Sequence, residues 1–527
     1  MKFKAKKSRS ITLIKGKQSE VRYVIGGENI PTVKEEPVKS LGRWYKEGLK
    51  DSEQGKLLKE SVEKGLKAID KTELPGKYKC WCMEFGLYLR VRWPLQMYEI
   101  PVTTVEKIEQ RCGVFIRKWL GLPKQLNNTA LYGNTNQLQL PISSIVEEYK
   151  ATKVQTVMML RFSNDSEIKE NPPIVKTGRK WKAEEATCQA ISNLEHADII
   201  GAVQEAREGV GLLNFRPFCE AGKKQKRKAV VAEVRREEQE KRYLHLVQCP
   251  QQGQCVRWEE NVVGRKIGWK EIWSWERSRT SFLIKSTYDV MPSPANLLRW
   301  KVAEDDRCRC GQKGTLRHIL SNCHLSLDRY TWRHNEILKI IHDVLKAKLE
   351  QFNDGALPKE EKITRMRFCK AGKGSEFKSH KRVPKTDERW QGSWKITTDL
   401  ESKLVFPVLV TEQRPDAVVR CDEKKACMIL ELTVPWEENI KQAEERKAER
   451  YSGLIEECEE KGWSVEYHHM AVGARGYIDK KLVNLFRKRF CCTNIEVRGA
   501  IKDLQEVAER SSHWIWLKRE DSNWLEN

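Results

Sequence analysis

Two acidic side chains in the last quarter of the chain could share a divalent cation. Asp416 follows Arg414 and Pro415, and Glu431 lies within the apolar run CMILELTV. The turn CDEKKA separates two strand-like segments, so both carboxylates are expected on neighbouring strands of one hairpin. Two carboxylates brought together repel each other unless a cation lies between them, and Mg²⁺ takes hard oxygen ligands of this kind.

A predicted helix brings a lysine to the same place. The helix runs from about Glu437 to Lys461 after Pro435, and its apolar stripe is predicted at 440, 443, 447, 451, 454 and 458. Lys447 lies within this stripe, and lysine is rarely buried without a partner. We expect Lys447 to face the two carboxylates, where it would orient a water molecule or neutralise charge in a transition state. Tyr451, one turn further on, would face the same site.

Each of these residues also has an ordinary interpretation. Asp416 could cap a turn, Glu431 could be exposed on its strand, and Lys447 could extend its ammonium group to solvent. Four acids of the helix are expected on its solvated face: Glu437, Glu438, Glu444 and Glu445. The hypothesis of chemistry therefore depends on the first three residues converging at one point.

A second group of residues could hold a metal through sulfur and nitrogen. The candidate ligands are Cys308, Cys310, His318 and Cys323. Three thiolates and one imidazole form a closed tetrahedral site, which is typical of structural zinc. Gly311 and Gly314 would let the chain turn between the two ligand pairs. The first pair is more tightly spaced than usual, so His324 and His334 remain alternative ligands, and unrelated buried thiols are the alternative interpretation.

The composition favours a polyanionic partner. Lys and Arg number 97 against 74 Asp and Glu in 527 residues, which gives a formal net charge of +23. A charge of this size favours phosphate backbones or an anionic membrane surface. No run of about 18 apolar residues occurs, and no apolar segment follows the basic N-terminus, so neither a membrane span nor a secretory signal is expected. The 16 Cys are therefore expected as thiols or metal ligands in a reducing compartment.

The elements that would position these residues follow from apolar periodicity and turn residues. Helices are predicted over 57–70, 103–120 and 182–194, the second ending at Gly121 with Pro123 beyond it. A charge-dense helix is predicted over 221–242, and its KKQKRK cluster could be a nuclear import signal, a phosphate contact or an exposed face. Strand-like segments cover 11–17, 21–30, 403–413 and 463–472.

On these residues the chain resembles the C-terminal part of a non-LTR retrotransposon reverse transcriptase of the class that carries a restriction-like endonuclease. Arg414-Pro415-Asp416, Glu431 and Lys447 with Tyr451 resemble the PD-(D/E)xK nuclease pattern, in the variant whose lysine has moved onto the following helix. The cysteine cluster resembles the zinc knuckle that precedes this endonuclease.

The resemblance extends over nearly the whole chain. Lys7-Ser8 and the run from Lys39 to Gly42 resemble late palm motifs, including the primer grip, and the segments WPLQMYEIP and IRKWLGLP resemble the thumb. The family implies target-primed reverse transcription, in which a nuclease nicks DNA and a polymerase extends the exposed 3′ end on an RNA template.

Two departures from the family matter. No Tyr/Phe-x-Asp-Asp polymerase motif occurs, since Asp305-Asp306 lies beside the cysteine cluster, and the fingers and most of the palm are missing. Polymerisation by this chain alone is therefore not expected. Thr433 stands where simple PD-(D/E)xK enzymes have lysine, so the role of Lys447 is inferred from its position on the helix.

The expected fold is multidomain α+β. The predicted parts are a palm remnant (1–45), a helical thumb-like region (46–210), a basic Trp-rich connector (211–300), a zinc knuckle (301–345), a linker or insertion (346–392) and an α/β restriction-endonuclease-like domain with a small mixed sheet (393–527).

The functional expectation is a retrotransposon fragment that binds a DNA target and element RNA. It would nick DNA with Mg²⁺ at Asp416 and Glu431 and carry structural zinc in the cysteine cluster. The alternative is a catalytically inactive nucleic-acid-binding remnant or co-opted module. Nuclear location is expected, otherwise cytoplasmic, without a membrane partner. The side chains expected to contact nucleic acid are Lys39, Arg43, Lys223, Lys224, Lys226, Arg227, Lys228 and Arg414.

Overall fold

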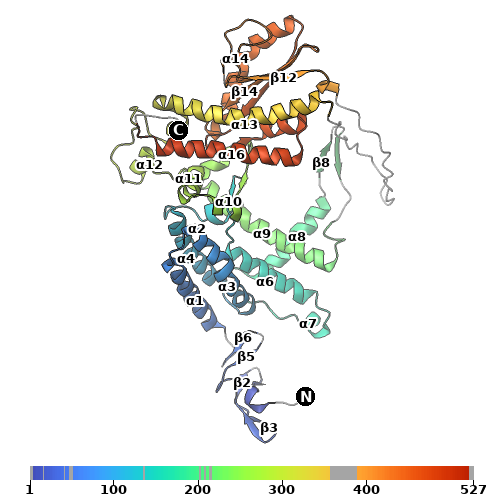
Figure 1. Ribbon diagram of the computed structural model, residues 1–527. Helices are drawn as coiled ribbons and strands as arrows, with labels where there is room; N and C mark the ends of the chain where they lie inside the picture. The colour runs from blue at the N-terminus through green and yellow to red at the C-terminus, as the bar shows by residue number, and fades with distance from the viewer. Residues whose placement is uncertain are drawn as a thin grey trace, which may run out of the picture. The chain divides into compact units, whose positions relative to one another are not determined.

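The computed structural model describes residues 4–15, 17–40, 42–46, 51–133, 137–200, 203–206, 209–212, 217–356, 388–400 and 402–521. Within these ranges the fold is mixed α and β, mainly helical with small sheets (Figure 1). The chain divides into two compact units, one of residues 1–120 and 142–241 and the other of residues 121–141 and 242–527. Residues 357–387, most of the predicted linker, lie outside the described ranges.

The first unit begins with short antiparallel hairpins. The segments predicted as strands over 11–17 and 21–30 each form a separate hairpin, because Lys15 and the pair Gly26 and Gly27 adopt positive φ and turn the chain within each segment. The paired strands are β1 (Thr12–Ile14) with β2 (Lys17–Ser19), β3 (Tyr23–Ile25) with β4 (Glu28–Ile30), β5 (Val38–Ser40) with β6 (Arg43–Tyr45), and β8 (Val203–Ala206) with β9 (Gly209–Leu212).

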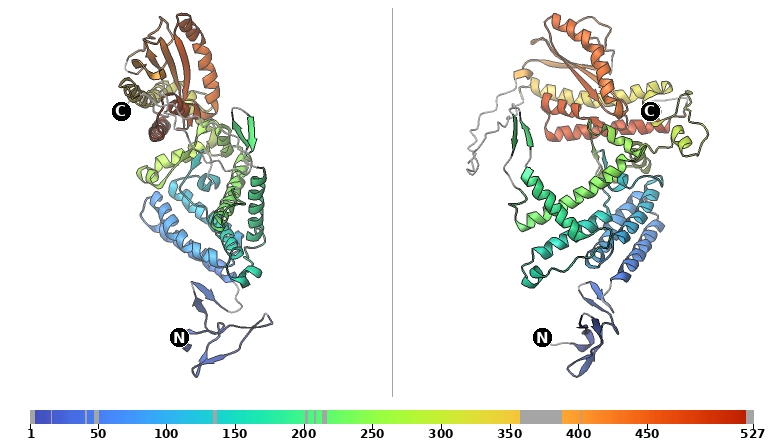
Figure 2. Two further views of the ribbon diagram at one scale, coloured as in Figure 1. Left: turned by 90° about the vertical axis from the view of Figure 1, so that its right-hand side faces the viewer. Right: turned by 180° about the vertical axis from the view of Figure 1, so that it is seen from behind.

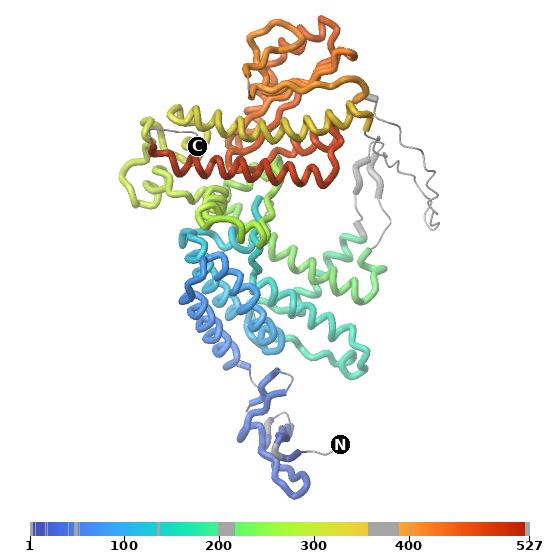
Figure 3. Tube along the Cα trace, in the orientation of Figure 1, coloured from blue at the N-terminus to red at the C-terminus, as the bar shows by residue number. Residues whose placement is uncertain are grey.

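Helices make up most of the first unit. They are α1 (Ser52–Lys71), α2 (Gly76–Cys82), α3 (Tyr88–Met97), α4 (Val102–Leu120), α6 (Ile145–Arg161), α7 (Ser166–Glu170), α8 (Ala183–Ile200) and α9 (Lys223–Val247). The four predicted helices are present as α1, α4, α8 and α9. Helix α4 ends at Leu120 because Gly121 takes the left-handed conformation, with φ +69°. Figure 3 traces α1 and α2, which both pack against α4.

The second unit contains the four-stranded sheet that carries the candidate carboxylates. The strands are β12 (Trp394–Thr398), β13 (Ala417–Cys421), β14 (Ala426–Thr433) and β15 (Ser464–Ala471), in that spatial order. The first two pairings are antiparallel, whereas β14 and β15 are parallel and are joined by helix α14 (Ile440–Glu460). Helix α14 ends before Gly462, whose positive φ allows the turn into β15.

Apolar residues alternate between the two faces of this sheet. Cys427 and Ile429 of β14 face α14, where they pack with Tyr451. Met428, Leu430 and Leu432 face the opposite side, against α13 (Leu327–Asn353) and α16 (Asn494–Leu517). Figure 2 shows the sheet between α14 and this helix pair. Helix α13 therefore belongs to the same core as the sheet, although the predicted division at 393 places it earlier.

The prediction of a strand over 403–413 is wrong. No strand is assigned from 402 to 413, although Leu404, Phe406 and Leu409 are buried against α14. Strand β12 already pairs with β13 at this edge of the sheet, and Pro407 has no N–H to donate to a ladder. Burial of apolar side chains from an irregular segment produced the misleading alternation.

The remaining elements of the second unit are short. They are α5 (Thr129–Tyr132), β7 (Leu138–Gln139), β10 (Val262–Val263), β11 (Arg265–Lys266), α10 (Trp269–Ser274), α11 (Arg277–Thr287), α12 (Pro294–Arg299), β16 (Ile478–Asp479) and α15 (Lys480–Asn484). Across the described ranges, every helix is too short or too polar to cross a lipid bilayer.

Candidate metal centre and carboxylate site

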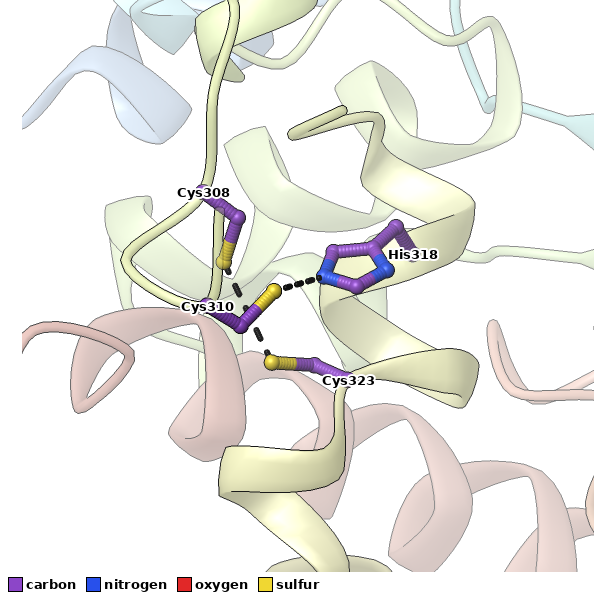
Figure 4. Close-up of side chains that lie close together, drawn as sticks. All are labelled: Cys308, Cys310, His318 and Cys323. Carbon is purple, nitrogen blue, oxygen red and sulfur yellow. Dashed lines mark hydrogen bonds between the residues drawn. The ribbon is translucent and has the colours of Figure 1, made fainter. Parts of the chain in front are cut away.

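The four predicted zinc ligands meet at one point in the second unit (Figure 4). Their ligand atoms all lie within 4.8 Å of one another. Sγ of Cys308 is 3.9 Å from Sγ of Cys323, and Sγ of Cys310 is 3.0 Å from Nε2 of His318. Tetrahedral zinc with ~2.3 Å bonds to sulfur would separate its ligands by roughly 3.7 Å. The cluster could therefore bind a metal such as zinc.

A tight turn and a wide helical turn supply the two pairs of ligands. Gly311 has φ +82°, which lets the chain reverse after Cys310, while His318 begins a π-helical turn that ends at Asn322. Burial and the charge of His324 lower the pKa of His318, which favours the neutral imidazole that binds metals. Burial raises the pKa of the Cys310 thiol. Hydrogen bonds from Gln312 and from the neighbouring thiols outweigh this effect and hold the pKa below its usual value.

The two alternative ligands lie outside the cluster. His324 is exposed, and the other four candidate residues meet without it. His334 lies instead at the carboxylate site, so it is not a ligand of this cluster. The turn that carries His318 also contributes Leu316, Ile319 and Leu320 to a buried cluster with Trp436 and Ile515.

The two candidate carboxylates occupy neighbouring positions of the β13–β14 hairpin. Ala417 pairs with Leu430, so Asp416 and Glu431 are next in the same register. The backbone N–H of Asp416 lies 3.4 Å from Oε2 of Glu431, and the N–H of Leu432 donates to Oδ2 of Asp416 at 2.7 Å. Glu431 is buried in the sheet and is not exposed on its strand.

Helix α14 brings Lys447 and Tyr451 to Glu431. The ammonium group of Lys447 forms an ion pair with Oε1 of Glu431, and the hydroxyl of Tyr451 donates to Oε2 at 2.9 Å. The Glu431 side chain is 3% exposed and that of Lys447 is 21% exposed. The Tyr451 hydroxyl also lies 3.0 Å from the carbonyl oxygen of Arg414. Both oxygens of Glu431 thus have partners from one helix.

Electrostatics at Glu431 favour an added positive charge. Burial raises the pKa of its carboxyl, and the charge of Asp416 acts in the same direction. Lys447 and Tyr451 act against these effects, yet the pKa remains raised. A divalent cation would stabilise the ionised form of both acids.

Two histidines that the sequence did not place here lie next to the carboxylates: His334 contacts Asp416, and His469 is paired with Glu431 across β14 and β15. Nε2 of His334 on α13 is 3.3 Å from Oδ2 of Asp416, and its Nδ1 is 3.2 Å from Oδ1 of Asn335. Burial lowers the pKa of His334, but contact with Asp416 outweighs it, so the pKa is raised. The hydroxyl of Thr433 and Nε2 of His469 are 2.7 Å apart. Burial lowers the pKa of His469 to about 4.

One of the four acids that were expected on the solvated face of the helix is not exposed. Glu437 is fully buried, where it forms an ion pair with Nε of Arg475 at 2.6 Å and accepts from its backbone N–H at 2.7 Å. Glu444 pairs with Lys481. Glu437 is therefore structural, since a buried carboxylate requires a partner of this kind.

The residues predicted to contact nucleic acid have different surroundings. Arg43 is engaged by Asp51 and by the carbonyl of Met97, which makes it part of the first unit's framework. Lys39 is exposed beside the Trp44 ring, and the side chain of Arg414 is 44% exposed. The remaining five lie in the first turns of α9: Lys223, Lys224, Lys226, Arg227 and Lys228.

A basic groove in the first unit was missed by the sequence analysis. The groove, of about 1140 Å³, lies between α1 and α4. Its basic side chains are Lys56, Lys59, Lys64, Lys67, Lys71, Lys107 and Arg111. The lysines of α1 that line the groove are exposed, and two acids, Glu60 and Glu63, lie among them. Glu63 pairs with Lys67 and Arg111, so the excess of positive charge comes mainly from the other lysines. The signal available in the sequence was the number of lysines on this one helix.

No protein-family model matches the chain, and no curated protein matches it either.

Proposed function

We propose that this chain binds nucleic acid and nicks DNA by metal-dependent hydrolysis of a phosphodiester. The observation that carries the proposal is the meeting of Asp416 and Glu431 with Lys447 and Tyr451 from the next helix. Two acids that meet beside a lysine, one of them buried and the other half-buried, favour a site for a cation and a phosphate over a packing contact.

Each residue has a distinct role in the proposed reaction. Asp416 and Glu431 would hold a divalent cation such as Mg²⁺, which lowers the pKa of a bound water and stabilises the leaving oxygen. Lys447 would orient the attacking water and offset negative charge on the phosphate. Tyr451 holds Oε2 of Glu431 in place, and the exposed guanidinium of Arg414 would contact the DNA strand.

The proposed substrate is supported by the charge of the chain. The net charge of +23 and the basic groove between α1 and α4 favour a nucleic acid, because each neutralised phosphate releases counterions. The cysteine cluster would carry structural zinc. We further propose that the chain corresponds to the C-terminal part of a retrotransposon reverse transcriptase, with the predicted domain order. In this proposal it acts in the nucleus on target DNA and element RNA.

A plasmid-nicking assay tests the proposal. The full chain with Mg²⁺ is expected to convert supercoiled DNA to open circles, and Asp416→Asn is expected to abolish this activity. Asp422→Asn is the matched control, since Asp422 lies in the turn of the same hairpin and is 54% exposed. Equal nicking by wild type and Asp416→Asn, or no nicking by either, would contradict the proposal.

A second candidate is a binding protein without nuclease activity. The groove that supports it is built by α1 and α4 and does not use the carboxylates. This candidate predicts salt-dependent DNA binding that Asp416→Asn leaves unchanged, together with no nicking by the wild type. The same assay therefore separates the two functions.

A further inference from the structure

The carboxylate of Asp416 is held through one of its two oxygens. Oδ2 accepts the N–H of Leu432 at 2.7 Å and lies 3.3 Å from Nε2 of His334. Within the described residues, no hydrogen bond reaches Oδ1. Fixing one oxygen in this way orients the other, which is how outer residues commonly set a carboxylate ligand.

His334 is well placed to act on Asp416 because its own position is fixed. Nε2 is also 3.3 Å from the carbonyl oxygen of Leu432, and Nδ1 is 3.2 Å from Asn335. The ring therefore contacts three groups: the carboxylate of Asp416, the carbonyl of Leu432 on the strand that carries Glu431, and the side chain of Asn335. A side chain with both ring nitrogens engaged can hold a carboxylate in one orientation.

Helix α13 is anchored one turn before His334. The hydroxyl of Tyr330 donates to the carbonyl of Ile319 at 2.7 Å and accepts the N–H of Cys323 at 3.1 Å. Residues four apart lie on one face of a helix, so Tyr330 and His334 face the same side. The helix is thus attached to the cysteine cluster at one turn and to Asp416 at the next.

His334 also lines a cavity of about 270 Å³. Ser321, Thr331 and Val434 contribute to its wall, and the buried Oγ of Ser321 has no hydrogen-bond partner. Arg333, also in the wall, is 1% exposed and donates to Ser512 at 2.8 Å. The His334 side chain is 23% exposed, so it lies at the edge of the core and not inside it.

We propose that His334 is a positioning residue for Asp416: it fixes Oδ2 so that Oδ1 is presented, with Glu431, to a divalent cation. This role rests on the proposed metal-dependent function. His334 would not itself bind the cation or the reacting phosphate. It acts through Asp416, and Tyr330 holds the helix that carries it.

Mn²⁺ binding to the full chain, followed by electron paramagnetic resonance, tests the role without relying on activity. Wild type is expected to bind Mn²⁺, and Asp416→Asn is expected to lose this binding. His334→Ala should weaken binding about 10-fold to 100-fold, the usual cost of losing an outer partner of a metal ligand. His334→Gln retains an N–H donor near the position of Nε2 and should recover most of the affinity. His342→Ala, on the same helix, should bind as wild type does.

A merely structural role would give a different pattern. If His334→Ala only loosened the fold, His334→Gln would bind as weakly as His334→Ala, and thermal unfolding would report a comparable loss in both. Tyr330→Phe should weaken Mn²⁺ binding less than His334→Ala, and the double variant should bind no more weakly than His334→Ala alone. If the losses of Mn²⁺ affinity from Tyr330→Phe and His334→Ala add up in the double variant, the role given to Tyr330 is overturned.

The outcomes also separate this inference from the proposed function. Wild-type affinity in His334→Ala overturns the positioning role while leaving the nuclease proposal in place. Mn²⁺ binding that depends on Asp416 and His334, without DNA nicking, supports the positioning role and contradicts the nuclease. A wild type that does not bind Mn²⁺ overturns both.

Discussion

Lys447 on α14 forms an ion pair with Glu431 on β14, sixteen residues earlier in the chain. The positively charged partner of Glu431 thus comes from the helix. The strand residue two positions after Glu431 is Thr433, which carries no charge. The hydroxyl of Thr433 is engaged with His469 at 2.7 Å. The positive charge beside Glu431 therefore comes from α14 and not from β14.

Removing this ammonium group should affect both stability and activity. Lys447→Ala leaves the carboxylate of Glu431 buried without its cation, so the free energy of unfolding should fall by about 1–3 kcal/mol. DNA nicking should be lost in the same variant. Urea denaturation followed by tryptophan fluorescence measures the first effect. Lys441→Ala, exposed on the same helix, should change stability by less than about 0.5 kcal/mol. Identical behaviour of the two variants would contradict the role given to Lys447.

The cysteine cluster should hold one metal ion. Elemental analysis of the purified chain is expected to return about one zinc per chain, and Cys310→Ser should release it. Cys219→Ser removes an exposed thiol outside the cluster and should retain the zinc. Because the turn at His318 packs against Trp436 and Ile515, zinc removal should also lower the thermal stability of the second unit. A folded wild type with no bound metal would exclude the site.

His469 should make stability depend on pH in a known direction. Its pKa is about 4 in the folded chain against 6.5 for the free side chain, so the unfolded chain binds the proton first as pH falls. Stability is therefore full above about pH 6.5 and decreases toward pH 4, by an amount on the order of 1–3 kcal/mol. His469→Gln should lose this part of the pH dependence. His324→Gln, at an exposed histidine, should keep the wild-type profile, and an unchanged profile in His469→Gln would refute the prediction.

The groove between α1 and α4 should contribute to nucleic-acid binding. Lys59→Gln combined with Lys64→Gln should weaken binding and reduce the slope of log K against log salt by roughly two, or ~0.9 for each lost phosphate contact. Fluorescence anisotropy with a labelled duplex measures both quantities. Lys270→Gln, exposed in the second unit, should leave the slope unchanged. Equal slopes for all three proteins would remove the groove from the binding surface.

Local patterns predicted the parts of the structure whose determinants lie close together in sequence. The stripe of α14 placed Lys447 among buried residues, and Gly121 marked the end of α4. The Cys308 to Cys323 cluster was also found from spacing, because all four ligands come from one short segment. In each case the positions that decide the geometry are within a few turns of one another.

Contacts between distant segments could not be predicted in this way. His334 reaches Asp416 from a helix 82 residues earlier, and no periodicity connects the two positions. Leu404 and Phe406 alternate as a strand would, yet they are buried from an irregular segment. The burial of Glu437 depends on Arg475, which lies beyond β15. Packing partners far along the chain decided each of these outcomes.

Helix α13 has a practical consequence for recombinant expression of this protein. Ile337, Leu338 and Ile341 cover one face of the sheet that carries Glu431. A gene trimmed at residue 393 would keep every residue of the nuclease pattern but lose the part of the cover over Leu430 and Leu432 that α13 provides. Such a product would aggregate, because an uncovered apolar sheet face associates with other copies. A truncated protein that is to stay soluble must therefore retain helix α13 (Leu327–Asn353).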